Sequence, residues 1–205
     1  MDNKLIYTLL LIIIILSTIL IFKINKAPEY DKEIYNEIYN EYEQIISIKE
    51  EKTESKEQKK NNDIEIYQNA SGNTYKVCAT ISIPKITYTA PIISETSEEY
   101  LKIAPTKLFG PEPNQIGNFC IVGHNYEDDR FFSDLYKLEI GDIIQLSDRQ
   151  NNKLNYKVYN KFEVYEDDLS ITNQNTEGKV EITLITCTNN PRKRLVVKCA
   201  SIEEI

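Results

Sequence analysis

From residue 73 onward, the apolar pattern changes from a helical spacing to runs in which apolar residues recur at every second position. Val77, Ala79, Ile81 and Ile83 alternate with polar side chains, and Pro84 interrupts the run. A period of two is typical of strands that bury one face. Further strands are expected at 86–93, 118–123, 142–147, 153–166, 180–186 and 194–201, with short helices at 97–108 and 129–138. Seven or so short strands and few helices predict a mainly β domain, either a closed barrel or a sandwich.

Ahead of this domain, the eighteen residues from Leu5 to Phe22 carry no charge. A helix of that length spans about 27 Å, close to the hydrocarbon core of a bilayer. A cleavable secretory signal has a shorter apolar region that ends at a small-x-small site, whereas this run ends beside Lys23 and Lys26. Residues 1–26 are therefore expected to be an uncleaved, single-pass membrane anchor. Basic residues lie on both sides of it, so the short tail before a long remainder is what favours an extracellular domain.

Residues 27–72 are expected to form a charged linker. Ile34, Ile38, Tyr42 and Ile45 recur every three or four residues, which predicts an amphipathic helix with a narrow apolar stripe. The almost wholly polar stretch 49–62 is expected to be a solvated helix end or a disordered spacer. Two interpretations of the helix stay open: a stalk that lifts the domain off the membrane, or a segment whose stripe packs on the domain or on another copy.

The composition excludes several classes of function. A net charge of −8, from 24 Lys and Arg against 32 Asp and Glu, argues against an electrostatic nucleic-acid binder. The single His excludes any mechanism that needs two, and there is no Cys-x₂₋₄-Cys pair for a zinc site. The acidic cluster Glu166–Asp168 is expected to be a solvated loop. We therefore predict no required metal and no cofactor.

Two side chains that can do chemistry follow expected strands. His124 comes after an apolar run and Gly123, where a buried strand meets solvent and an imidazole can exchange protons. Cys187 ends the run 180–186 just before a turn-forming Thr-Asn-Asn-Pro cluster, so its thiol is expected to be partly exposed. A thiol becomes an effective nucleophile when a neighbouring base or cation favours its thiolate.

A guanidinium is available on the next expected strand. If 180–186 and 194–201 pair as a hairpin, Arg194 lies beside Cys187 and its N–H groups can stabilise an oxyanion formed by thiolate attack on a carbonyl. Arg192 is the alternative, but it lies within the turn and is expected to be solvated. Cys199 is five residues beyond Arg194, roughly 16 Å along a strand, which disfavours a disulfide with Cys187.

These residues lie in motifs that resemble those of sortases. Residues 183–187 (Thr-Leu-Ile-Thr-Cys) resemble the TLxTC signature, 122–125 (Val-Gly-His-Asn) the histidine motif, and 194–197 (Arg-Leu-Val-Val) the arginine strand. The resemblance covers residues 74–205 and agrees in the order His, Cys, Arg. It implies a closed eight-stranded sortase-type β-barrel at 73–205. The moderate loop at 165–178 is more similar to classes A and D than to class B.

The resemblance also implies an activity, a cysteine transpeptidase on the outer face of a Gram-positive-type cell membrane. Such an enzyme cleaves an LPXTG-like C-terminal sorting signal of surface proteins and passes the thioacyl group to an amine of a peptidoglycan precursor or a pilin. Cys187 would be the nucleophile, and His124 the general acid and then the base. Arg194 would hold the substrate and stabilise the oxyanion, and Thr186 would help to line the substrate site.

Two other functions stay open at this point. The domain could be a surface module that only binds or scaffolds, with Cys187 and His124 as packing residues. It could also be a thiol hydrolase of peptide signals that lacks an acceptor. Loss of peptide cleavage in Cys187→Ala separates an enzyme from a binding module, and an added amine separates transfer from hydrolysis.

Overall fold

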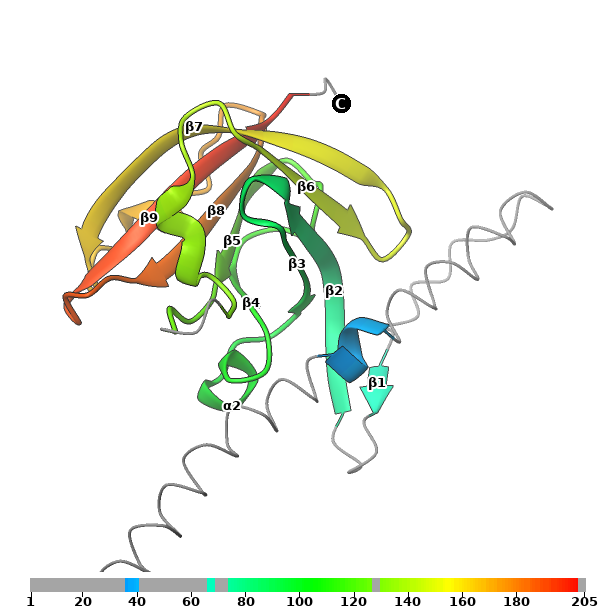
Figure 1. Ribbon diagram of the computed structural model, residues 1–205. Helices are drawn as coiled ribbons and strands as arrows, with labels where there is room; N and C mark the ends of the chain where they lie inside the picture. Colours follow the sequence, from blue (N-terminus) through cyan, green and yellow to red (C-terminus); the bar gives the residue numbers. More distant parts are fainter. Residues whose placement is uncertain (1–35, 41–65, 69–73, 127–129, 203–205) are drawn as a thin grey trace, which may run out of the picture.

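The computed structural model describes residues 36–40, 66–68, 74–126 and 130–202 (Figure 1). These ranges contain a helical turn at 36–40, one further α-helix, three 3₁₀ helices and nine strands. The strands are β1 (Ile66–Gln68), β2 (Thr74–Ile83), β3 (Tyr88–Ile93), β4 (Thr106–Phe109), β5 (Gly117–Val122), β6 (Ile143–Asp148), β7 (Lys153–Tyr165), β8 (Val180–Cys187) and β9 (Lys193–Ser201). The helices are η1 (Pro84–Ile86), α2 (Glu98–Leu101), η2 (Ser133–Lys137) and η3 (Leu169–Thr172).

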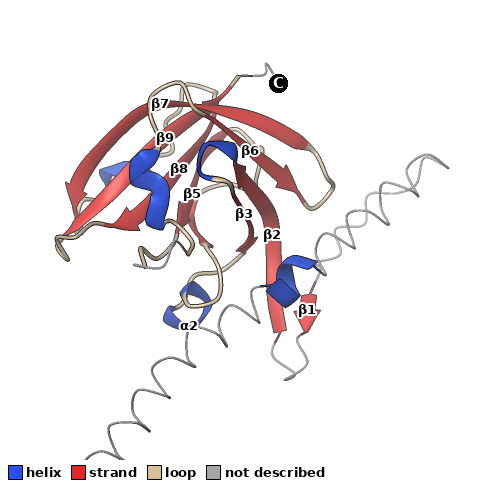
Figure 2. Ribbon diagram, in the orientation of Figure 1, coloured by secondary structure: helices blue, strands red, loops and turns tan. Residues whose placement is uncertain are grey.

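Eight of the described strands close into a barrel, as expected. Their order is β2-β3-β4-β5-β8-β9-β7-β6, and β6 returns to pair with β2. β1 pairs with the first residues of β2, outside this ring. Figure 2 shows the strands wrapped around a common interior, with the short helices in the connections. Most neighbours are antiparallel, but β3 pairs with β4 in parallel at one position, and β5 and β8 run parallel along their length. The chain between β5 and β8 forms β6 and β7.

The barrel interior is filled by the apolar residues of alternate strand positions. Ile81, Phe119, Leu184 and Val197, from four different strands, are fully or almost fully buried in one cluster with Phe132. Each buried side chain of this size contributes about 1.5–3 kcal/mol to folding. Because successive side chains of a strand point to opposite faces, the intervening residues of β8 and β9 lie on the outer face of the barrel wall.

Cys78 differs from the expected pattern, because its place in the alternation is polar and yet it is buried in the core. The ladder between β2 and β3 shifts register between Val77 and Ala79. Such a bulge adds a residue to one strand and changes which side chains face inward. Burial raises the pKa of the Cys78 thiol to about 12. All four cysteines are free, and Cys199 lies opposite Ile182 rather than near Cys187.

The segment 97–108, expected to be helical, is helical only at its start. Ser97 caps α2 by accepting the N–H of Tyr100 at 3.1 Å, and the helix ends at Leu101. The end of the segment belongs to β4, which pairs with β3 and β5. A four-residue strand is too short for its alternation to be recognised, which explains why the sequence did not predict it.

The helical turn at 36–40 lies against the barrel. Ile38 is fully buried in a cluster with Tyr75, Val77, Ile93 and Ile103. For Ile38, this confirms the interpretation in which the apolar stripe packs on the domain. The other positions of the stripe lie outside the described residues.

The described residues do not test the membrane anchor. None of the helices in the described ranges is long and apolar enough to span a bilayer. The expected anchor at 1–26, and most of the linker at 27–72, lie outside those ranges.

Candidate active site

The parallel strands β5 and β8 end side by side. His124 follows β5 after one glycine, and Cys187 is the last residue of β8. Their ladder runs in register up to Val122 opposite Ile185. Because parallel strands have their carboxyl ends at the same edge, His124 and Cys187 each lie two residues beyond the same ladder position. Both residues are half-buried, as expected for groups at a strand end.

Side-chain hydrogen bonds continue this register after the ladder ends. The Thr186 hydroxyl donates to the Gly123 carbonyl at 2.8 Å, and the Asn125 side-chain amide donates to the Cys187 carbonyl at 2.8 Å. Residues 123–125 are therefore held against the end of β8 even though the main chain has left the sheet. His124 lies inside this held segment.

Gly123 leaves no room for a side chain. A Cβ atom there would lie 2.9 Å from Cδ2 of Phe132, whose ring is fully buried in the barrel core. The Phe132 N–H donates in turn to the carbonyl of His124 at 3.1 Å. The glycine lets the main chain lie directly against this ring, so that His124 stays close to the end of the barrel.

The surroundings of His124 favour its neutral imidazole. Its ring packs against Tyr126 with 5.1 Å between centroids, and the Arg130 guanidinium lies 4.2 Å from the Tyr126 ring centroid. Burial lowers the pKa of His124, and the positive charges of Lys102 and Arg130 lower it further. A lowered pKa makes the imidazolium a stronger acid, which suits a group that protonates a leaving amine.

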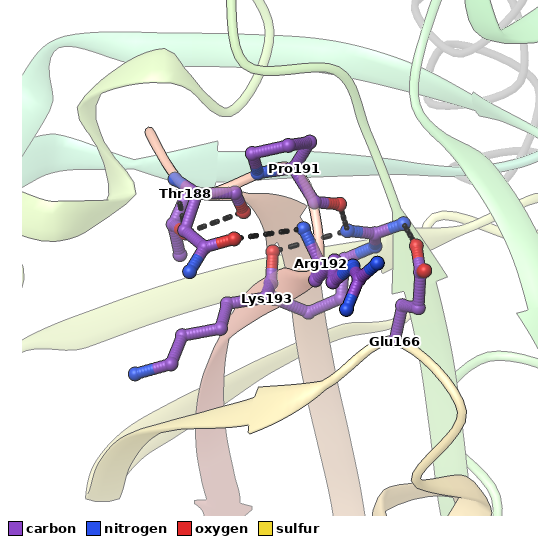
Figure 3. Close-up of polar contacts among 7 residues, drawn as sticks. Glu166, Thr188, Pro191, Arg192 and Lys193 are labelled. Atoms are coloured by element: carbon purple, nitrogen blue, oxygen red, sulfur yellow. Dashed lines mark hydrogen bonds and ion pairs between the residues drawn. The ribbon is translucent and has the colours of Figure 1, made fainter.

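Arg194 lies directly opposite Cys187 in the antiparallel ladder of β8 and β9, which confirms the expected hairpin register. Opposite residues of such a pair share one face of the sheet. Figure 3 shows the polar contacts around the turn that joins the two strands. The Arg194 guanidinium donates to the Glu166 carboxylate at 2.9 Å and to the carbonyls of Pro191 and Lys193 at 2.8 and 3.0 Å. The Arg192 alternative is exposed, as expected.

The outer face that carries Cys187 and Arg194 continues into an apolar cluster. Ile185 and Val196, two positions along each strand, are buried beneath Ile171 of η3. A buried apolar cluster therefore lies next to the end of β8, under the loop between β7 and β8.

The loop that carries Ile171 is fastened to β5 by paired amides. The Asn118 side chain donates to the carbonyls of Ile171 and Asn173 at 3.0 and 3.2 Å. The Gln174 side chain accepts the Asn118 N–H at 3.1 Å and donates to the Asn118 carbonyl at 2.9 Å. These bonds order the loop over the outer face.

Cys187 also borders a cavity of about 590 Å³ at the end of the barrel. Neutral hydrogen-bonding groups line it, among them Asn125, Tyr136 and the turn residues 188–190, together with the Glu163–Lys193 ion pair. A second cavity of about 710 Å³ lies near the start of β5 and β8, beside Gly117 and residues 174–178. Seven residues of extended β8, about 23 Å, separate that end of the strand from the thiol.

Thr186, expected to line the substrate site, is only 2% exposed. It borders the cavity at Cys187, but its hydroxyl is engaged by the Gly123 carbonyl. In this structure its visible role is to tie the two strand ends together.

Sequence reasoning missed two residues of the site. Asn125 belongs to the histidine motif, which is a usable signal, but its bond to Cys187 depends on the parallel pairing. The expected solvated loop at 166–168 is an exposed turn, and Glu166 pairs there with Arg194, a contact that the sequence did not predict. Asp168 caps η3 by accepting the Ser170 N–H. Hydrogen bonds from the Ser170 side chain and from this N–H lower the pKa of the Asp168 carboxyl. Among the described residues, no three His, Cys, Asp or Glu side chains come together as a metal site.

Known proteins match both the sequence and the fold. Residues 81–202 match the family model of the Sortase domain. Sortase A from Bacillus anthracis is 34% identical over 135 residues, which cover 63% of this chain and 61% of that protein, less than two thirds of its length. Because the family model matches more than half of the chain, the protein belongs to the sortase family.

Two solved structures illustrate the shared fold. The Clostridium perfringens Sortase D5 transpeptidase superposes with a TM-score of 0.61 at 24% identity, covering 84% of this chain and 98% of that one. Sortase C1 from Streptococcus agalactiae superposes with a TM-score of 0.54 at 31% identity, covering 62% and 68% of the two chains.

Proposed function

We propose that this protein is a membrane-anchored cysteine transpeptidase with its catalytic domain outside the cell. The domain at 73–205 would follow an anchor at 1–26 and a linker at 27–72. Its substrates would be surface proteins that carry a C-terminal LPXTG-like sorting signal, and its acceptor an amine of a peptidoglycan precursor or a pilin. The observation that supports this most strongly is the common register at which His124 and Cys187 follow the parallel strands β5 and β8.

The reaction balances with the groups at this edge of the barrel. The Cys187 thiolate attacks the scissile carbonyl, the peptide C–N bond breaks, and the leaving amine takes a proton from the His124 imidazolium. The acceptor amine then attacks the thioester and loses a proton to His124 as the thiolate departs. The lowered pKa of His124 favours the neutral imidazole, the form that takes the proton of the acceptor amine, and makes the imidazolium of the first step a stronger acid.

Arg194 would stabilise the oxyanion in both steps. Its position opposite Cys187 on the same face of the sheet supports this role. Val164, which pairs with Arg194 and is half-buried against the apolar cluster, supports a donor peptide with apolar side chains. The polar cavity that Cys187 borders, whose lining includes the Glu163–Lys193 ion pair, supports a polar acceptor.

The test is cleavage of fluorogenic sorting-signal peptides by the full chain. We expect wild type to cleave and Cys187→Ala to be inactive. The control Cys199→Val removes a thiol buried in the core of the same sheet and should keep activity. Cleavage that survives Cys187→Ala would refute the assignment of Cys187 as the nucleophile. If no sorting motif is cleaved, the result would favour a binding module. With an added amine, a ligated product indicates transfer, and hydrolysis alone indicates a peptidase.

A further inference from the structure

Glu166 reaches the arginine of the site from the end of β7. The last ladder pair between β7 and β9 is Tyr165 opposite Lys193, and the Glu166 N–H donates to the Arg192 carbonyl at 2.9 Å. The backbone of Glu166 is therefore fixed one residue beyond the ladder. Its carboxylate accepts from Nη2 of Arg194 at 2.9 Å.

A count of donors shows what remains available on Arg194. A guanidinium has five N–H groups in a rigid plane. Nη1 donates to the Pro191 and Lys193 carbonyls of the turn, and Nη2 donates once to Glu166. Within the described part of the chain, no acceptor meets the N–H of Nε or the second N–H of Nη2. Two donors thus stay open for a group outside the protein.

We propose that Glu166 is a positioning residue for Arg194. The carboxylate and the two turn carbonyls hold the guanidinium from two different elements, at the ladder position opposite Cys187, and leave two of its donors for an oxyanion. The proposal rests on the proposed function, in which Arg194 binds the oxyanion.

The anchoring acts through orientation. An ion pair as exposed as this one, with side-chain exposures of 25% for Arg194 and 50% for Glu166, adds little to folding. An oxyanion donor, however, must be held within a narrow range of angles, because removing one such donor typically costs 10²–10³ in rate. Loosening a donor without removing it should cost less, about tenfold.

The experiment measures kcat and KM of the full chain on a cleavable sorting-signal peptide. Glu166→Ala should lower kcat about tenfold with KM nearly unchanged. Glu166→Gln keeps a carbonyl oxygen that accepts from Nη2 and should restore most of the rate. The matched control is Glu112→Ala, since Glu112 is 49% exposed and pairs with Lys107 at 2.8 Å. That variant should keep the wild-type kcat and the same thermal stability as Glu166→Ala.

A double-mutant cycle separates positioning from other effects. In an Arg194→Met background, Glu166→Ala should cause no further loss. Formation of the thioacyl enzyme, followed for hours by intact-protein mass spectrometry, keeps the rate of this slow background measurable. An unchanged or raised kcat in Glu166→Ala would overturn the proposal, as would an equal loss in both backgrounds.

A second measurement needs no substrate. Nuclear magnetic resonance reports the rotation of the Arg194 guanidinium about its Nε–Cζ bond, which should speed up in Glu166→Ala and stay slow in Glu112→Ala. Equal rotation rates would overturn the proposal. If wild type cleaves no peptide, the proposed function fails, and this rotation still decides whether Glu166 holds Arg194.

Discussion

Thr186→Val should damage both the stability and the activity of the protein. Valine has nearly the shape of threonine but cannot donate to the Gly123 carbonyl, which the Thr186 hydroxyl reaches at 2.8 Å. The site is 2% exposed, so water cannot easily replace the donor. Losing one partner of a buried hydrogen bond costs about 1–3 kcal/mol. At about 2–4 °C per kcal/mol for a chain of this size, Tm should fall by about 2–12 °C.

The activity of Thr186→Val should fall by about tenfold, because the lost bond holds the segment that carries His124. A shift of 1 Å in a reacting group can cost 10²-fold in rate, and the Asn125 bond to Cys187 remains to limit the displacement. The assays are thermal unfolding followed by circular dichroism and kcat/KM for peptide cleavage by the full chain.

The matched control is Thr183→Val. Thr183 is also fully buried on β8, and its hydroxyl donates to the side-chain oxygen of Asn118 at 2.6 Å. It should lose similar stability and keep its kcat/KM within about twofold of wild type, since it lies four residues from Cys187. Wild-type stability and activity in Thr186→Val would refute the reasoning, and so would an equal loss of rate in Thr183→Val.

The other predictions concern the surroundings of the site. Lys102→Met removes the positive charge that lowers the pKa of His124 more than Arg130 does, so the titration midpoint of the single His, followed by nuclear magnetic resonance, should rise. An unchanged midpoint would contradict the electrostatic explanation. Ile38→Ala should cost about 2–5 kcal/mol of unfolding free energy in urea, whereas no loss would favour a free stalk. Gly123→Ala should lower the free energy of unfolding by about 1–3 kcal/mol, because the added methyl group meets the Phe132 ring. Adding Phe132→Leu to this variant should restore part of the loss. If Gly123→Ala alone is as stable as wild type, the steric argument fails.

The strands of the barrel could largely be predicted from alternation, and the hairpin that joins Cys187 to Arg194 followed from a short turn between two of them. Strand alternation depends only on which face is buried, which the sequence shows directly. β4 was missed because four residues are too few to show a period. Cys78 lies in the core although the alternation places it among the polar positions of its strand, because a bulge changes which side chains face inward.

The meeting of β5 with β8 could not be predicted from alternation or turns. The two strands are separated by the whole of β6 and β7, and only the closed barrel makes them neighbours. His124, Cys187 and Arg194 were singled out by their place at strand ends and by the resemblance to sortases. The supporting contacts of Asn125 and Glu166 depend on side-chain geometry across strands, which the sequence does not contain.

The most direct test of the central claim is to locate the covalent intermediate. The full chain is mixed with a sorting-signal peptide, quenched in acid, digested and mapped by mass spectrometry. The account predicts an acyl adduct on the fragment that contains Cys187, absent in Cys187→Ala and strongly reduced in His124→Ala. An adduct on Cys78, Cys120 or Cys199, or an undiminished adduct in His124→Ala, would contradict it.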